Sequence, residues 1–277
     1  MPATERKTAR RAENLDDLVN TILALPSRPF SVNEFRASLL NAKKPRKRKD
    51  GTDKRARVGD STLSDYFAVA RDLGFVRKAD GSYEVPKAVI ASIRERQDKH
   101  ELREYVGRLL INNLDVVRRF LDFIKGKPRT PQELSKEFNP QTAGILVSWL
   151  TWSGILQRNR VDGRYYSVAL DEVPMSLEGF WTKMLEAYES LRSTPLVGVK
   201  ATYVKIPDLR EVFCTSNAKK RQTFDALLKR ALSDPRFRRK IEVTGAPISY
   251  IAEEEDRSEA EPLVYDDRVF YFIAIKR

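Results

Sequence analysis

Apolar residues recur along the chain at helical spacing, and each helical stretch is followed by short apolar runs around a glycine turn. In the first stretch, the apolar residues of 15–25 fall on one helix face. Helices are also predicted over 32–40, where Ser31 and Glu34 suit a capping box, and over 63–73, with Ser61 or Thr62 as the cap. Residues 75–85 then read as two strands around Asp80–Gly81, a dipeptide typical of hairpin turns. The chain is therefore expected to begin with three helices and a β-hairpin.

The same order of elements occurs twice more, with slight identity between the copies. In the second copy, helices are expected over 114–124, 131–138 and 141–154, with a hairpin over 155–168. Thr130 and Glu133 suit a capping box at the start of the second of these helices. In the third, helices are expected over 176–191, 207–213 and 216–232, with an extended run over 199–206 and strands over 241–243 and 269–275. We interpret this repetition as three structural segments.

The repetition predicts a helix-rich α+β protein. Apolar residues between 89 and 109 predict a linking helix with a polar centre, either a rigid spacer or a dimerisation arm that would make the chain a homodimer. The expected division is a basic tail over 1–13, a first segment over 14–86 with a basic loop at 42–60, a helical linker over 87–112, a second segment over 113–170, and a third segment over 171–277 with an acidic loop at 252–262.

The charge balance favours a polyanionic partner. Among 277 residues, 51 Lys and Arg stand against 39 Asp and Glu, a formal net charge of +12. Such a surplus indicates nucleic acid first and an anionic membrane second. No apolar run reaches the roughly 18 residues of a membrane-spanning helix, and the first residues lack the apolar core of a secretory signal. We therefore expect a protein of the cytoplasm or nucleoid without a membrane partner.

Metal, cofactor and catalytic chemistry find little support in the sequence. The single cysteine, Cys214, excludes an intramolecular disulfide framework, and the single histidine, His100, argues against a histidine zinc site. Phosphate-binding loops, dinucleotide fingerprints and nucleophile elbows are absent from the sequence. The nearest carboxylate pairs, Asp171–Glu172 and Asp266–Asp267, are interpreted as strand ends, with a metal nuclease built on scattered carboxylates as the catalytic alternative. We expect no enzyme activity, metal or cofactor.

Two stretches resemble the winged helix-turn-helix superfamily. They are Ser61-Thr62-Leu63-Ser64-Asp65-Tyr66-Phe67 followed by Leu73-Gly74-Phe75-Val76, and Pro131-Gln132-Glu133-Leu134 followed by residues 149–156. In both, a helix leads through a glycine junction into a hairpin. The resemblance covers most of the chain and implies three tandem winged-helix domains joined by helical linkers, with a role in DNA binding. Tandem winged helices are also similar to plasmid replication initiators.

The densest charge lies in the stretch 42–58, between two helices of the first segment. It holds nine cations against two carboxylates and has no apolar anchor, so we expect it to be disordered in isolation. Beside a recognition helix it would follow a phosphate backbone. The alternative is a solvated or targeting loop. The expected phosphate contacts are Lys43, Lys44, Arg46, Lys47, Arg48, Lys49, Lys54, Arg55 and Arg57.

The polar start of the third helix is the candidate reader of bases. Thr62, Ser64 and Asp65 are expected to point away from the apolar face, and in the resembling fold this end of the helix enters the major groove. Asp65 would repel phosphate, which favours a base contact. Arg77 and Lys78 on the following hairpin are candidate backbone or minor-groove contacts. The alternative is a helix cap with an ordinary polar surface.

The corresponding helix of the second segment, 141–154, contains no Lys or Arg, so it is expected to have little affinity for phosphate. Trp149 and Trp152 are expected in the core or at a protein contact, because base-stacking platforms sit in cationic grooves. The hairpin that follows supplies three candidate backbone contacts, Arg158, Arg160 and Arg164.

Cations gather again at both ends of the long helix of the third segment. The alternative interpretation is a charged solvent face, and the acidic loop is expected to screen these cations when DNA is absent. The candidate DNA contacts are Asn217, Lys219, Lys220, Arg221, Arg238 and Arg239.

Together these features predict a double-stranded DNA-binding protein of the transcriptional-regulator or replication-initiator type. The alternative is an adaptor or scaffold subunit of a larger DNA-associated complex, for example in defence or chromosome maintenance, that uses winged helices for protein contacts. The cation-free helix of the second segment favours a protein partner for that segment.

Overall fold

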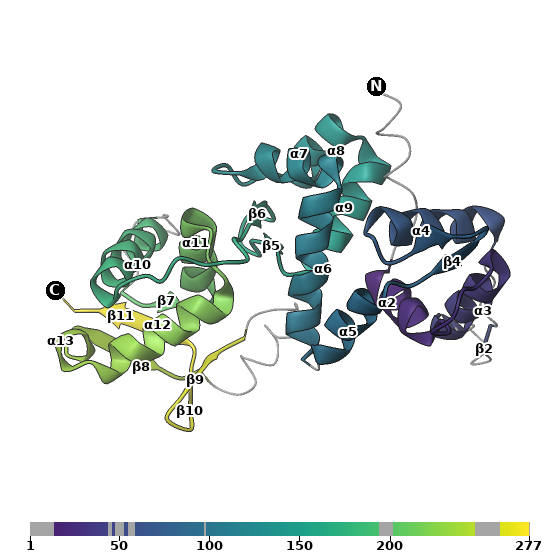
Figure 1. The fold of residues 1–277 in the computed structure, drawn as a ribbon. Coiled ribbons are helices and arrows are strands. Elements are labelled where there is room, and N and C mark those ends of the chain that lie inside the picture. The colour runs from purple at the N-terminus through teal and green to yellow at the C-terminus, as the bar shows by residue number, and fades with distance from the viewer. Residues whose placement is uncertain are drawn as a thin grey trace. The chain divides into compact units, whose positions relative to one another are not determined.

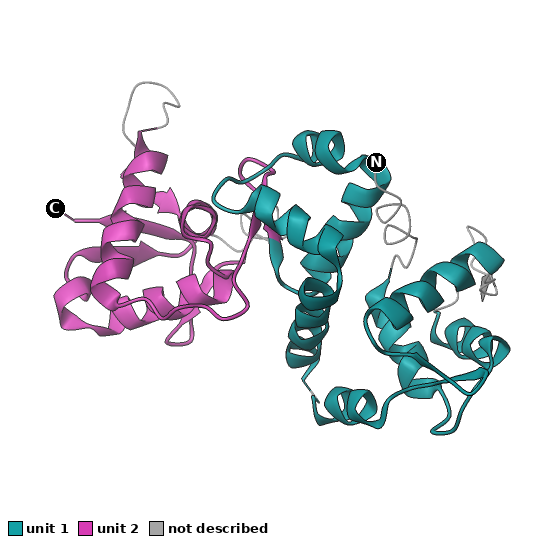
Figure 2. Ribbon diagram, turned by 45° about the horizontal axis from the view of Figure 1, so that its top comes forward, with its two compact units in different colours: residues 1–156 teal, residues 157–277 magenta. Residues whose placement is uncertain are grey.

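A computed structural model describes residues 14–43, 46–47, 53–54, 59–96, 98–193, 202–246 and 261–276. Throughout these residues the chain is a helix-rich α+β protein with small antiparallel sheets that follow helices, as predicted (Figure 1). It divides into two compact units, residues 1–156 and 157–277, coloured separately in Figure 2. In the parts described, no helix is long and apolar enough to span a bilayer.

Unit 1 begins with the three helices and the hairpin that the hydrophobic pattern predicts. These elements are α2 (Leu15–Ala24), α3 (Val32–Ala42), α4 (Asp60–Asp72), β3 (Arg77–Ala79) and β4 (Ser82–Glu84). The predicted turn residues Asp80 and Gly81 both have positive φ, which suits a tight hairpin. Phe30 and Tyr83 exchange backbone hydrogen bonds of 2.7 and 3.0 Å, so a third extended segment joins the hairpin.

The start of α4 differs from the sequence expectation. The pattern of the third helix predicts Ser61 or Thr62 as its cap, but both lie inside it, and Gly59 is the cap residue. Asp60 stands in the first turn, where a carboxylate interacts favourably with the positive end of the helix dipole. The helix therefore begins before the predicted cap.

The long basic loop contains a short hairpin that the sequence pattern does not predict. Between α3 and α4, β1 (Arg46–Lys47) pairs antiparallel with β2 (Asp53–Lys54). Of the predicted phosphate contacts here, Lys44, Arg48, Lys49, Arg55 and Arg57 lie outside the described residues. The basic tail over 1–13 and residues 252–260 of the acidic loop also lie outside them.

The predicted linking helix is two helices, α5 (Lys87–Glu95) and α6 (Lys99–Asn113). The interruption falls in the polar centre of the pattern. Arg96 leaves the helical conformation, with φ −91° and ψ 81°, and the Asp98 side chain accepts a hydrogen bond from the His100 N–H. Asp98 thus caps a new helix, which explains why one periodic pattern contains two elements.

The second group of three helices in unit 1 consists of α7 (Asp115–Ile124), α8 (Pro131–Phe138) and α9 (Pro140–Trp152). Thr130 and Glu133 form the capping box that starts α8, as the sequence indicates. A side chain at Gly107 of α6 would come within 2.8 Å of Ile155, so glycine allows α6 to approach the end of α9 closely. The chain continues into β5 (Leu156–Arg158) and β6 (Tyr165–Ser167), which form a two-stranded sheet.

Unit 2 combines a helical layer with a three-stranded antiparallel sheet in the order β7–β11–β8. Three aromatic rings at the centre of the helices, Phe180, Phe213 and Phe224, pack with centroids 5.2 to 5.7 Å apart. The elements are α10 (Leu177–Arg192), β7 (Val204–Lys205), α11 (Ile206–Asn217), α12 (Arg221–Ser233), α13 (Pro235–Arg238), β8 (Ile241–Thr244), β9 (Leu263–Tyr265), β10 (Arg268–Phe270) and β11 (Phe272–Ile275).

The expected extended run ends in β7, and the expected final strand is divided into β10 and β11. β9 and β10 form a separate hairpin between β8 and β11, and Asp266 and Asp267 at its turn both have positive φ. These two carboxylates directly follow β9, in agreement with their interpretation as a strand end, and form the turn to β10.

Candidate nucleic-acid interface

The polar face of α4 exposes fewer of the predicted base-contacting residues than its sequence suggests. Ser64 is exposed and Thr62 is half-buried, but Asp65 is only 7% exposed. The expectation that Asp65 points away from the core is wrong. Val69, one turn later on the same side of the helix, is also buried, so the apolar face of α4 is wider than the pattern indicates. A buried carboxylate is not positioned to reach a base edge.

The hairpin after α4 places two predicted cations at the surface. The Arg77 Nε donates to Glu84 Oε1 at 2.6 Å, directly across the two strands, and the Arg77 side chain stays 67% exposed. Lys78 is exposed beside it. Exposed ion pairs of this kind contribute about 0–1 kcal/mol to stability. A phosphate can therefore replace Glu84 as the partner of Arg77 at small energetic loss.

In the second segment, the two tryptophans of α9 differ in burial. Trp149 is 1% exposed and belongs to the core, so it offers no surface to a partner in the folded chain. Trp152 is half-buried, with the Arg103 guanidinium 5.5 Å from its ring centroid. The exposed line of α9 is uncharged and consists of Gln141, Gly144, Ser148 and Thr151.

The three hairpin arginines have different environments. Arg158 and Arg164 are exposed at the surface. The Arg160 side chain is 17% exposed, and its Nη2 donates to Asp208 Oδ1 of α11 at 3.1 Å. The neighbouring Asn159 is buried and donates to Thr215 Oγ1 at 2.9 Å. Arg160 therefore attaches the hairpin to α11 and is not presented to solvent as a backbone contact.

Arg221, predicted to bind DNA, lies in the strongest ion pair of this network. Its Nε donates to Glu211 Oε1 at 2.6 Å and its Nη2 to Glu211 Oε2 at 3.1 Å. Glu211 is 1% exposed, so this bidentate pair is largely removed from water. The Arg221 Nη2 also donates to the Arg158 carbonyl oxygen at 2.7 Å, which links α12 to the hairpin.

Glu172 contacts two more of the predicted DNA-binding residues, Lys219 and Lys220. Its carboxylate accepts hydrogen bonds of 2.7 Å from the Lys220 N–H and from the Thr223 hydroxyl, at the start of α12. The Lys219 side chain is 11% exposed, and its Nζ donates to the Val173 carbonyl oxygen at 2.7 Å. The Asn217 amide donates to the Phe213 carbonyl oxygen at 2.8 Å. The contacts of Glu172 with the Lys220 N–H and Thr223 stabilise the start of α12, whereas the Asn217 contact lies within the last turn of α11.

The acidic partners of this network were not identifiable from the sequence. Arg210 was missed as well; it is 2% exposed and donates to Asp225 Oδ1 and the Glu261 carbonyl oxygen, both at 2.8 Å. Burial raises the pKa of the Asp225 carboxyl, and the nearby Arg210 guanidinium opposes that increase. Asp208, Arg210 and Glu211 all lie on α11.

The opposite end of α12 presents cations to solvent. Six of them are exposed there. Arg236 pairs with Asp234 and Glu178, and within the described residues none of the other five forms an ion pair with a carboxylate. The Lys240 ammonium lies 5.9 Å from the centroid of the Trp181 ring, a weak cation–π contact. We call this group the cationic patch; it consists of Lys229, Arg230, Arg238, Arg239 and Lys240.

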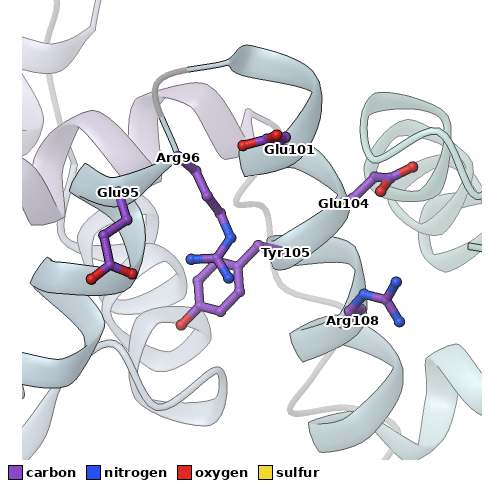
Figure 3. A pocket seen from close by; sticks show the side chains of 6 residues that line it. All are labelled: Glu95, Arg96, Glu101, Glu104, Tyr105 and Arg108. Atoms are coloured by element: carbon purple, nitrogen blue, oxygen red, sulfur yellow. The ribbon is translucent and has the colours of Figure 1, made fainter.

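Unit 1 contains an open cleft between α5 and α6, shown in Figure 3. Its volume is about 400 Å³, and its lining combines three glutamates with two arginines and one tyrosine: Glu95, Arg96, Glu101, Glu104, Tyr105 and Arg108. The Arg96 guanidinium lies over the Tyr105 ring at 4.3 Å from the centroid. The mixed charges of the lining do not select one class of ligand.

In the described parts of the chain, no group of three or more His, Cys, Asp or Glu residues is placed to hold a metal ion. Cys214 is buried, and burial raises the pKa of its thiol, so the group stays protonated at neutral pH.

Comparison with known proteins identifies no relative: no family model, no curated protein and no solved structure matches this chain.

Proposed function

We propose that this chain binds double-stranded DNA and that its three segments are winged helices. The order of elements in unit 2 supports this fold: a helix (α10), a strand (β7), two helices (α11 and α12), and two strands (β8 and β11) in one sheet of order β7–β11–β8. The first segment has the same order, with Phe30 in the place of the first strand. In such an arrangement the third helix and the hairpin are available to a nucleic acid.

The single observation that carries the proposal is the cationic patch. Exposed cations that form no ion pair keep most of their attraction for phosphate, because no intramolecular pair must be broken when DNA binds. Lys229 and Arg230 lie on the last turns of α12, and Arg238 to Lys240 follow in α13 and the turn after it. Five cations clustered on consecutive elements favour an extended polyanion over a small anion, since a duplex offers many phosphates to one surface.

The excess of cations over the whole chain supports the same partner, since the net charge of +12 steers a polyanion toward the surface before specific contacts form. The function would be that of a transcriptional regulator or a replication initiator. Both activities require a duplex-binding module, and neither requires a catalytic group within this chain.

The test is a titration of the full chain against a fluorescent duplex of random sequence at several salt concentrations. The variant Arg230→Ala, Arg238→Ala, Arg239→Ala is compared with the control Lys125→Ala, Lys127→Ala, Lys136→Ala, which removes the same charge from exposed positions of unit 1. In the patch variant only, the slope of log K against log salt should become shallower by about 0.9 for each phosphate that the protein no longer neutralises. Equal effects in both variants, or no duplex binding by the wild type, would contradict the proposal.

A second candidate function is an adaptor in a DNA-associated complex, and the exposed line of α9 favours it. That line is uncharged, and its Gly144, Ser148 and Thr151 residues are small enough for close contact with another protein. If the wild-type chain does not bind duplex DNA in the titration above, the adaptor function becomes the better account.

A further inference from the structure

The three segments present three helices at the same place in the element order, namely α4, α9 and α12, and their exposed faces differ. We infer that α12 is the helix that reads DNA sequence and that Gln222 and Ala226 read an adenine–thymine step in the major groove. The inference rests on the proposed DNA-binding function and adds to it the residues and bases that give specificity.

One line of exposed residues runs along α12 and consists of Gln222, Ala226, Lys229 and Ser233. The spacing of four, three and four residues places them on one side of the helix, opposite the buried residues Phe224, Leu227, Leu228, Ala231 and Leu232. Figure 1 shows α12 at the front of unit 2. The line contains no carboxylate, so nothing on it repels the phosphates on either side of a groove.

The chemistry of this line suits base edges. The Gln222 amide forms no hydrogen bond in the described part of the chain, so both its donor and its acceptor are available. A glutamine amide matches the N7 acceptor and N6 donor of adenine, and an alanine methyl packs against the methyl of thymine. Four residues of helix rise about 6 Å, which is roughly two base-pair steps.

The buried network explains how Gln222 is held in place. It directly follows Arg221, whose bidentate pair with the buried Glu211 anchors the first turn of α12. Glu172 fixes the same turn through the Lys220 N–H and the Thr223 hydroxyl. A reader on an anchored helix loses less conformational entropy when it binds a base. Arg221 and Lys220, which the sequence predicted as DNA contacts, thus position Gln222, the residue that we infer contacts a base.

The other two helices lack part of this combination. On α4, the first residue is Asp60, whose side chain is 91% exposed at the end that would approach phosphate, although it pairs with Arg36. The exposed Ser64 is short and bears one hydroxyl. On α9, Gln141 offers an amide but the helix has no cation. Of these three helices, α12 alone has an amide, a methyl and a cation on one exposed line.

The experiment is a selection of bound sequences from a pool of random duplexes with three full-length proteins: the wild type, Gln222→Ala and the control Ser64→Ala on α4. The wild type and Ser64→Ala should select the same motif with an A·T pair. Gln222→Ala should lose the preference at that pair, with a drop of roughly 5- to 150-fold in affinity for the selected site. Its affinity for unselected duplexes should stay level.

A second measurement uses the selected duplex with 7-deazaadenine in place of the adenine, which removes the N7 acceptor. This change should weaken the wild type and leave Gln222→Ala unaffected. A motif that is unchanged in Gln222→Ala, or the absence of any motif despite duplex binding, would overturn the role of α12 and leave the proposed function standing. Absence of duplex binding by the wild type would overturn both.

Discussion

The hairpin of the first segment and the start of α12 carry the same sequence signal, a group of cations beside a helix, and the structure uses the two groups differently. Arg77 and Lys78 stay at the surface, where Arg77 pairs with Glu84 on the neighbouring strand. Arg221 and Lys219 turn inward and join the buried Glu211 and the half-buried Glu172. Charge density along the sequence therefore does not by itself identify a binding surface.

The difference depends on where the carboxylates lie. Glu211 comes ten residues before Arg221, on the preceding helix, and Glu172 precedes even α10. Folding brings both carboxylates to the start of α12, where a cation must pair with them to offset the cost of burying them. At the other end of α12 the described residues bring no carboxylate into an ion pair with the patch cations. The patch is therefore a part of unit 2 whose charges remain available to a partner.

The difference between the two groups of cations has its largest expected effect on stability when one cation is removed from each group. Arg221→Ala leaves the carboxylate of Glu211 buried without its partner and should lower the free energy of unfolding by about 3–5 kcal/mol. Arg77→Ala, the matched change in an exposed pair, should lower it by at most about 1 kcal/mol. Urea unfolding of both variants followed by circular dichroism measures the difference.

Similar small losses of stability in both variants would show that the Arg221–Glu211 pair is not buried in solution. In that case Arg221 would return to the set of candidate DNA contacts, and the distinction between the two groups of cations would disappear.

A smaller effect separates two neighbours on α4. Asp65→Ala removes a buried carboxylate from the groups that interact with it and should destabilise unit 1 by about 1–3 kcal/mol. Ser64→Ala changes an exposed position and should stay within about 0.5 kcal/mol of the wild type. Thermal unfolding of the two variants compares them. An Asp65→Ala variant as stable as the wild type would return Asp65 to the surface, where a contact with a base is feasible.

Local signals in the sequence predicted most of the elements. The capping boxes Ser31–Glu34 and Thr130–Glu133 are both present in the structure, because a cap depends on residues only three apart. The Asp80–Gly81 turn forms for the same reason, since two residues decide its conformation. The helix-rich α+β class followed directly from these elements.

Features that depend on distant residues were not predictable from one sequence. The burial of Asp65 depends on what packs against α4, and the pairing of Arg160 and Arg221 depends on the acidic face of α11. The interruption at Arg96 was missed because apolar residues at helical spacing stand on both sides of the polar centre that contains it. The division into three winged helices and the DNA-binding role of the remaining cations stay predictions.

We propose that DNA is bound by the exposed cations and not by those within the buried network. Acetylation of the lysines in the presence and absence of a duplex distinguishes these two groups. Mass spectrometry follows each lysine of the full chain. Lys229 and Lys240 should react in the free protein and become protected when the duplex is bound, while the exposed Lys125 and Lys136 should react equally in both states. Lys219, whose Nζ donates to the Val173 carbonyl oxygen, should react slowly in both states. Unchanged reactivity of Lys229 and Lys240 under saturating duplex would contradict the claim.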